Sequence, residues 1–130
     1  MEAGQVIKDL KSRESTDILY KVCCDVLRAL MILHGSAWQS DLTFTLEGLW
    51  SLRDLTLGEV NDLRGRLDDA LNLLNERGIV SSEKRVRASL SPPYSEEEMF
   101  HYTESLFTLI REFGSNGSVL KYRKEIMGYR

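Results

Sequence analysis

The sequence predicts a mainly α-helical protein with a small β-hairpin and a C-terminal helix. Apolar residues recur at helical spacing through much of the chain, glycines follow the two longest apolar stripes, and alternating side chains follow the second glycine. The 130 residues match the usual size of one domain, and 42% hydrophobic content is enough for one core. We therefore expect a single domain over 1–114 and a basic polar tail over 115–130.

The first half of the chain predicts three helices. A short helix is expected over 5–13. Asp17 is a candidate cap for a second helix that ends before Gly35. Residues 36–44 lack a helical pattern and predict a loop with at most a short extended piece, and a third helix is expected over 46–54. The apolar stripe of the second helix consists of Ile18, Leu19, Val22, Cys23, Val26, Leu27, Leu30 and Leu33.

A long helix is predicted over 56–77. Thr56 and Glu59 form a T-x-x-E capping box at its start, and Gly78 follows its last turn. Gly65 weakens this helix and marks either a kink or a break between two helices.

The segment after Gly78 predicts a hairpin followed by another helix. Ile79 and Val80 start one strand, residues 81–84 form the link, and residues 85–90 form the second strand. Its outward side chains would be those of Arg85, Arg87 and Ser89. Pro92 and Pro93 end this strand. Ser95 and Glu98 then form a second capping box, which predicts a helix over 95–113 that opens with three glutamates.

The candidate chemical groups do not predict an enzyme. Cys23 and Cys24 are adjacent, so we expect one thiol packed in a helix core and its neighbour at the margin. His34 and His101 lack nearby ligand partners, and no nucleophile-elbow, phosphate-loop or zinc-protease motif is present. We expect no metal and no cofactor.

Positive charge is concentrated in two segments of a chain whose net charge is −3. Residues 81–94 carry three basic residues and one acid, and residues 115–130 carry four basic residues and one acid. Residues 95–114 between them carry five acids and one base. A local basic patch matters more to a phosphate backbone than the total charge.

The element order and the stretch LNLLNERGIV, residues 71–80, resemble the winged-helix family of helix-turn-helix DNA-binding domains. Length and layout are similar to those of small MarR/PadR-like prokaryotic regulators. The resemblance covers residues 17–90 and implies a winged helix-turn-helix with a C-terminal helix. It places the supporting helix at 46–54, with the recognition helix inside the long helix and the hairpin as the wing. An alternative register has its supporting helix at 57–63 and starts recognition at Arg66.

The resemblance implies a transcriptional regulator that binds double-stranded DNA. Early residues of a recognition helix reach base edges in the major groove, and a basic wing contacts phosphates. The expected base-contacting residues are Asn61, Arg64 and Arg66, and the expected phosphate contacts are Lys84, Arg85 and Arg87. The alternative is a winged-helix module that binds protein and not DNA, which the net charge of −2 over 59–77 favours.

A wide apolar stripe on the predicted C-terminal helix suggests a homodimer, whose two wings would address two DNA half-sites. The expected interface residues are Met99, Tyr102, Leu106, Ile110 and Phe113. The N-terminal segment is mixed in charge and lacks the apolar region of a signal peptide, and no stretch is apolar enough to span a membrane. We therefore expect a cytoplasmic protein without a membrane partner.

Overall fold

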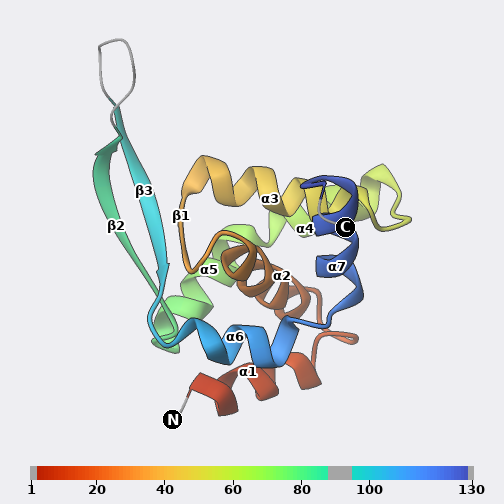
Figure 1. Ribbon diagram of the computed structural model, residues 1–130, viewed down its shortest axis with the longest axis horizontal. Helices are drawn as coiled ribbons and strands as arrows, with labels where there is room; N and C mark the ends of the chain where they lie inside the picture. The colour runs from red at the N-terminus through yellow and green to blue at the C-terminus, as the bar shows by residue number, and fades with distance from the viewer. Residues whose placement is uncertain (1–2, 88–94, 129–130) are drawn as a thin grey trace.

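The computed structural model describes residues 3–87 and 95–128, in which helices enclose one central helix and a three-stranded sheet projects from one side (Figure 1). The helices are α1 (Ala3–Ser12), α2 (Ile18–Ile32), α3 (Gln39–Ser51), α4 (Leu57–Gly65), α5 (Leu67–Glu76), α6 (Leu106–Phe113) and α7 (Gly117–Glu125). The strands are β1 (Ser36–Trp38), β2 (Val80–Arg87) and β3 (Ser95–Tyr102). This confirms a mainly helical fold with a small sheet. Across the described ranges, no helix has the length and apolar character that a membrane crossing requires.

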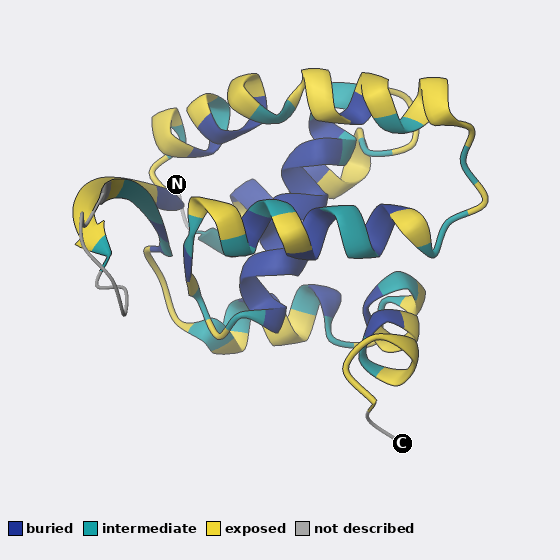
Figure 2. Cartoon of the chain, turned by 90° about the horizontal axis from the view of Figure 1, so that it is seen from above, coloured by how far each residue is buried: buried dark blue, intermediate teal, exposed yellow. Residues whose placement is uncertain are grey.

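Helix α2 forms the centre of the core. The predicted cap is present, because the Asp17 carboxylate accepts a hydrogen bond of 2.9 Å from the Leu19 N–H. Twelve of the 15 residues of α2 are buried, and Figure 2 shows the helix surrounded on all sides. The chain leaves the helix through Gly35, whose φ of 95° suits a residue without Cβ.

The two cysteines lie in the most enclosed part of α2. Both Cys23 and Cys24 are fully buried, so the prediction holds for one thiol, and its neighbour lies in the core and not at the margin. Burial raises the pKa of each thiol to about 12. Both side chains therefore stay protonated and act as small apolar groups.

The single helix predicted over 56–77 is two helices that meet at Arg66. The Thr56–Glu59 capping box is present at the start of α4, with both reciprocal hydrogen bonds formed. Glycine has a low helix propensity, so interrupting the helix at Gly65 loses little free energy. Asp68 places negative charge in the first turn of α5, where the helix dipole favours it. The chain therefore breaks beside Gly65, and α5 begins one residue after Arg66.

Helix α3 begins earlier than expected. It starts at Gln39, inside the segment 36–44 predicted as a loop, and only Ser36–Trp38 is extended. The side chain of its N-cap residue, Trp38, makes no capping hydrogen bond. A carboxylate from strand β3 does so instead, as described below.

The predicted hairpin is wrong in its pairing. Strand β2 runs unbroken over Val80–Arg87, so residues 81–84 are part of a strand and not a link. Its partner is β3, and the antiparallel pairing joins Val80 to Tyr102 and Arg87 to Ser95. The strand order is β1-β3-β2, which leaves β2 at an edge. Ser89, Leu90, Pro92 and Pro93 lie outside the described residues.

The helix predicted over 95–113 is correct only in its second half. Residues Ser95–Tyr102 form β3, and helix α6 begins after Ser105, whose hydroxyl accepts a hydrogen bond from the Phe107 N–H. Alternation explains the strand, because Phe100 and Tyr102 are buried while His101 between them lies on the opposite face.

The segment predicted as a polar tail contains helix α7. Asn116 caps this helix, and Val119 and Tyr122 are buried. The ring of Tyr122 lies against Gly48 of α3, where an added Cβ would come within 2.5 Å of it. Any larger residue at Gly48 would therefore separate α3 from α7.

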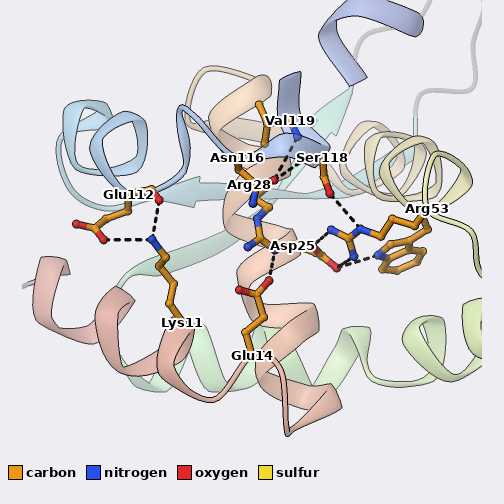
Figure 3. A network of polar contacts seen from close by, with 10 residues as sticks. Lys11, Glu14, Asp25, Arg28, Arg53, Glu112, Asn116, Ser118 and Val119 are labelled. Carbon is orange, nitrogen blue, oxygen red and sulfur yellow. Dashed lines mark hydrogen bonds and ion pairs between the residues drawn. The ribbon is translucent and has the colours of Figure 1, made fainter. Parts of the chain in front are cut away.

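A buried polar cluster joins four parts of the fold (Figure 3). Asp25 on α2 is fully buried and accepts two hydrogen bonds from Arg53, of 2.9 and 2.6 Å. Arg28 donates to it at 2.9 Å, and the Trp50 indole donates at 3.0 Å. Arg28 also pairs with Glu14, in the turn that follows α1. We call Glu14, Asp25, Arg28, Trp50 and Arg53 the Asp25 cluster.

Candidate functional site

The six predicted DNA-contacting residues occupy two separate places. Asn61 and Arg64 lie on α4, and Arg66 lies at the junction of α4 and α5. The other three side chains, those of Lys84, Arg85 and Arg87, belong to strand β2. In the alternative register α5 is the recognition helix. None of the six predicted DNA-contacting residues lies within its range, Leu67–Glu76.

The side chain of Arg64 is held by its own chain. Its guanidinium forms a two-point contact with the Glu47 carboxylate of α3, and it also donates a hydrogen bond of 2.7 Å to the Asn61 amide oxygen. The same contact lowers the pKa of Glu47 below its usual value, because the Arg64 hydrogen bonds favour the charged carboxylate. Base contact by Arg64 or Asn61 requires this arrangement to open.

Arg87, at the C-terminal end of strand β2, joins the wing to the start of α3. Its guanidinium lies 5.3 Å from the Trp38 ring centre and donates to the Ser40 hydroxyl at 2.8 Å. It pairs with Asp41 at 3.2 Å and with Glu97 at 3.5 Å. We call these five residues the Arg87 cluster.

Glu97 supplies the cap that α3 lacks. Its carboxylate accepts a hydrogen bond of 2.7 Å from the Ser40 N–H and another from the Ser40 hydroxyl. These bonds, with a smaller contribution from Arg87, lower the pKa of Glu97. A carboxylate at a helix N-terminus also interacts favourably with the helix dipole. Strand β3 therefore helps to fix where α3 begins.

The basic residues of β2 lie opposite the acidic residues of β3. The register pairs Lys84 with Glu98 and Arg85 with Glu97, and the third glutamate faces Val86. Opposite charges on facing strands stabilise the pair. The three glutamates predicted to open a helix are therefore the cross-strand partners of the basic cluster.

A hydrogen-bonded chain on the outer face of the sheet was missed by sequence reasoning. Ser36 on β1 lies 2.8 Å from Nδ1 of His101 on β3, and Nε2 of His101 lies 3.0 Å from Glu83 on β2. With Nε2 protonated, the ring donates to Glu83 and accepts from the Ser36 hydroxyl. No sequence signal pointed to this chain, because its three members are far apart and meet only through strand pairing. It links all three strands.

A groove of about 370 Å³ lies between α5 and the inner face of the wing. Helix α5 contributes Asp68, Leu71 and Asn72, and strand β3 contributes Glu98 and Phe100. Leu71 and Phe100, which are only 8% and 7% exposed, contribute apolar surface to its lining, and the groove is open to solvent. Its two charged lining residues are both carboxylates.

The exposed side of α5 extends this negative surface. Besides Asp68, it presents Asp69 and Glu76, and no basic residue lies within α5. We call Asp68, Asp69, Glu76 and Glu98 the acidic α5–wing face. Neither alternation nor helical spacing reveals it in the sequence, because Glu98 joins α5 only through the observed sheet.

The other predicted features are placed as follows. Tyr102 and Phe113, expected at a dimer interface, fill the core of their own chain. Met99 and Leu106 are half-buried, and Ile110 is exposed. Within the described parts of the chain, no group of three or more His, Cys, Asp or Glu side chains is arranged to hold a metal ion.

Comparisons with protein-family models, curated proteins and solved structures find no match to this chain.

Proposed function

We propose that this chain is a winged-helix module that binds a basic segment of a partner protein through the acidic α5–wing face. The order of elements supports the winged-helix assignment. We take α4 and α5, which are separated only by Arg66, as the helix-turn-helix pair, and the two-stranded β2–β3 sheet that follows directly as the wing. Helix α2 lies beneath them as the core helix.

The sign of the exposed charge supports a protein partner over DNA. Residues 57–102, which include both helices of the pair and the wing, carry nine acidic and six basic residues. A recognition helix must lie close to phosphates, and each carboxylate on it raises the free energy of that complex. A basic protein segment meets the same surface with opposite charge.

The observation that carries the proposal is the internal pairing of the expected DNA contacts. Arg64, Arg85 and Arg87 are each paired with a carboxylate of this chain. A phosphate would compete with Glu47, Glu83 or Asp41 for these guanidinium groups. Within the described residues the carboxylates of α5 take part in no ion pair, so a basic segment could reach them without displacing a partner.

A DNA-binding regulator is the second candidate, and two side chains favour it. Arg66 is exposed at the start of α5, and Lys84 lies on the inner face of the wing in register with Glu98. Neither makes an ion pair within the described residues. In a homodimer, two copies of Arg66 and Lys84 would be available to contact DNA phosphates.

Fluorescence anisotropy distinguishes the two candidates. We would titrate the full chain into a labelled decapeptide of alternating arginine and glycine, and separately into a labelled duplex of mixed sequence, at several salt concentrations. The proposal predicts tighter binding to the peptide. Changing Asp68→Asn with Asp69→Asn should weaken it several-fold, because both exposed carboxylates are removed.

The matched control changes two exposed acids elsewhere, Asp54→Asn with Glu125→Gln, and should leave peptide binding unchanged. Tighter, salt-sensitive binding to the duplex would overturn the proposal and support the DNA-binding regulator.

A further inference from the structure

We propose that the groove between α5 and the inner face of the wing is a subsite for one arginine side chain of the partner. This inference rests on the proposed function, because it takes the basic segment as given. It adds which basic residue is recognised and where. The groove combines apolar surface from two side chains with two carboxylates, a combination that suits a guanidinium on a three-carbon stem.

The base of the groove suits the stem. Leu71 of α5 and Phe100 of β3 both line the groove, and each has a small exposed fraction that an aliphatic stem would cover. The ring of Phe100 also offers an aromatic surface to a cation. A short polar side chain would leave this apolar surface in contact with water.

The carboxylates suit the head group. Asp68 and Glu98 come from different elements, so a guanidinium lying between them could donate to both at once. Within the described residues neither carboxylate takes part in an ion pair, in contrast to Glu97, which Arg87 and Ser40 engage. Lys84, opposite Glu98 in the strand register, is a cation of this chain that would compete with the guanidinium.

The geometry favours arginine over lysine. An ammonium is a compact charge that binds one carboxylate well, whereas the planar guanidinium presents five donors in a fixed arrangement. The side-chain amide of Asn72 at the same groove supplies a further acceptor. A lysine would satisfy one side of the groove and leave the other carboxylate solvated.

The test compares three labelled decapeptides that differ only in one residue type, which is arginine, lysine or citrulline alternating with glycine. Citrulline keeps the shape of arginine without its charge. We expect the full chain to bind the arginine peptide about tenfold more tightly than the lysine peptide, since a second charge-assisted hydrogen bond is worth about 1.5 kcal/mol. The citrulline peptide should bind more weakly still.

Paired variants locate the subsite. Asp68→Asn with Glu98→Gln keeps both shapes and should abolish the preference for arginine over lysine, whereas Asp54→Asn with Glu125→Gln should preserve it. Backbone amide shifts of Leu71 and Phe100 should move on titration with the arginine peptide and not with citrulline.

The outcomes separate the two proposals. Equal binding of arginine and lysine peptides, or an arginine preference that survives the paired variant, would overturn the subsite. The proposed function would stand if both peptides still bind more tightly than duplex DNA. Failure of every basic peptide to bind would overturn both.

Discussion

The Asp25 cluster and the Arg87 cluster are built from the same chemistry in two different environments. Each brings arginine, carboxylate and tryptophan side chains together, and each joins segments distant in sequence. Figure 3 shows the Asp25 cluster. Asp25 is fully buried inside the helical body, whereas Arg87 and Asp41 keep side-chain exposures of 37% and 48% where the C-terminal end of β2 meets the start of α3.

The difference teaches that burial decides what an ion pair contributes. In water, two charges gain little by meeting, and exposed pairs contribute about 0–1 kcal/mol. A buried charge cannot be resolvated, so removing its partner leaves an uncompensated ion. The Asp25 cluster should therefore govern stability, and the Arg87 cluster should govern how the wing is oriented for binding.

Removing the Asp25 carboxylate should have the largest effect. Asp25→Ala leaves Arg28 and Arg53 facing each other without their shared partner, and should reduce the free energy of unfolding by about 3–5 kcal/mol. Urea denaturation followed by circular dichroism measures it. Asp54→Asn, an exposed acid, is the control and should change stability by less than about 0.5 kcal/mol. A small loss in Asp25→Ala would show that the cluster is solvated.

Truncating Phe113 tests whether this residue belongs to the core or to an interface. Phe113→Ala should cost about 3–5 kcal/mol, because it empties a fully buried site and removes the ring beneath Arg28. Ile110→Ser, on the exposed face of α6, should leave stability nearly unchanged. If Ile110→Ser instead lowers the molecular mass seen in light scattering, α6 forms the predicted homodimer contact.

Acidification should lower the free energy of unfolding, because it protonates the Asp25 carboxylate. Burial raises the pKa of its carboxyl, but hydrogen bonds and charge from Arg53, Arg28 and Trp50 outweigh burial, and the folded-state pKa is lowered. Its stabilising contribution is thus complete above the ordinary value of 3.8 and is lost as the pH falls through the lower folded value. The free energy of unfolding, measured from neutral to strongly acid pH, should decrease as the pH falls below 3.8. Stability that rises on acidification there would contradict the assignment.

Changing Arg87→Lys should have the smallest effect on stability, at most about 1 kcal/mol. A lysine keeps the charge but cannot contact Ser40, Asp41 and Glu97 together. Hydrogen exchange should accelerate at the start of α3 and along β3 while the rest of the fold is unaffected. Arg85→Lys is the control, because the carboxylate that Arg85 pairs with belongs to its own strand. Equal protection in both variants would show that Arg87 does not hold the wing.

The same two regions differ in how well the sequence predicts them. In the helical body, local signals were sufficient: Asp17 caps α2, and Thr56 with Glu59 opens α4. The break at Gly65 was one of two open readings. The Asp25 cluster was not predictable, because Arg53 is distant in sequence from Asp25 and no local pattern links it to Asp25 or Arg28.

At the wing, local signals were misleading. Ser95 and Glu98 have the spacing of a capping box, and Met99 and Tyr102 continue a helical stripe. Pairing with β2 overrides this pattern, because it places Glu97 and Glu98 opposite basic residues and buries alternate side chains. The basic strand was read correctly as exposed, but its acidic partner was assigned to a helix. The acidic α5–wing face could not be predicted without that pairing.

The most direct test of the central claim reverses the charge of the acidic α5–wing face. The full chain and a variant carrying Asp68→Lys, Asp69→Lys and Glu98→Lys would each be titrated into the labelled arginine peptide and the labelled duplex. The account predicts that the unaltered chain prefers the peptide and that the variant prefers the duplex. A preference for the duplex in both proteins, or a peptide affinity unchanged by the reversal, would contradict it.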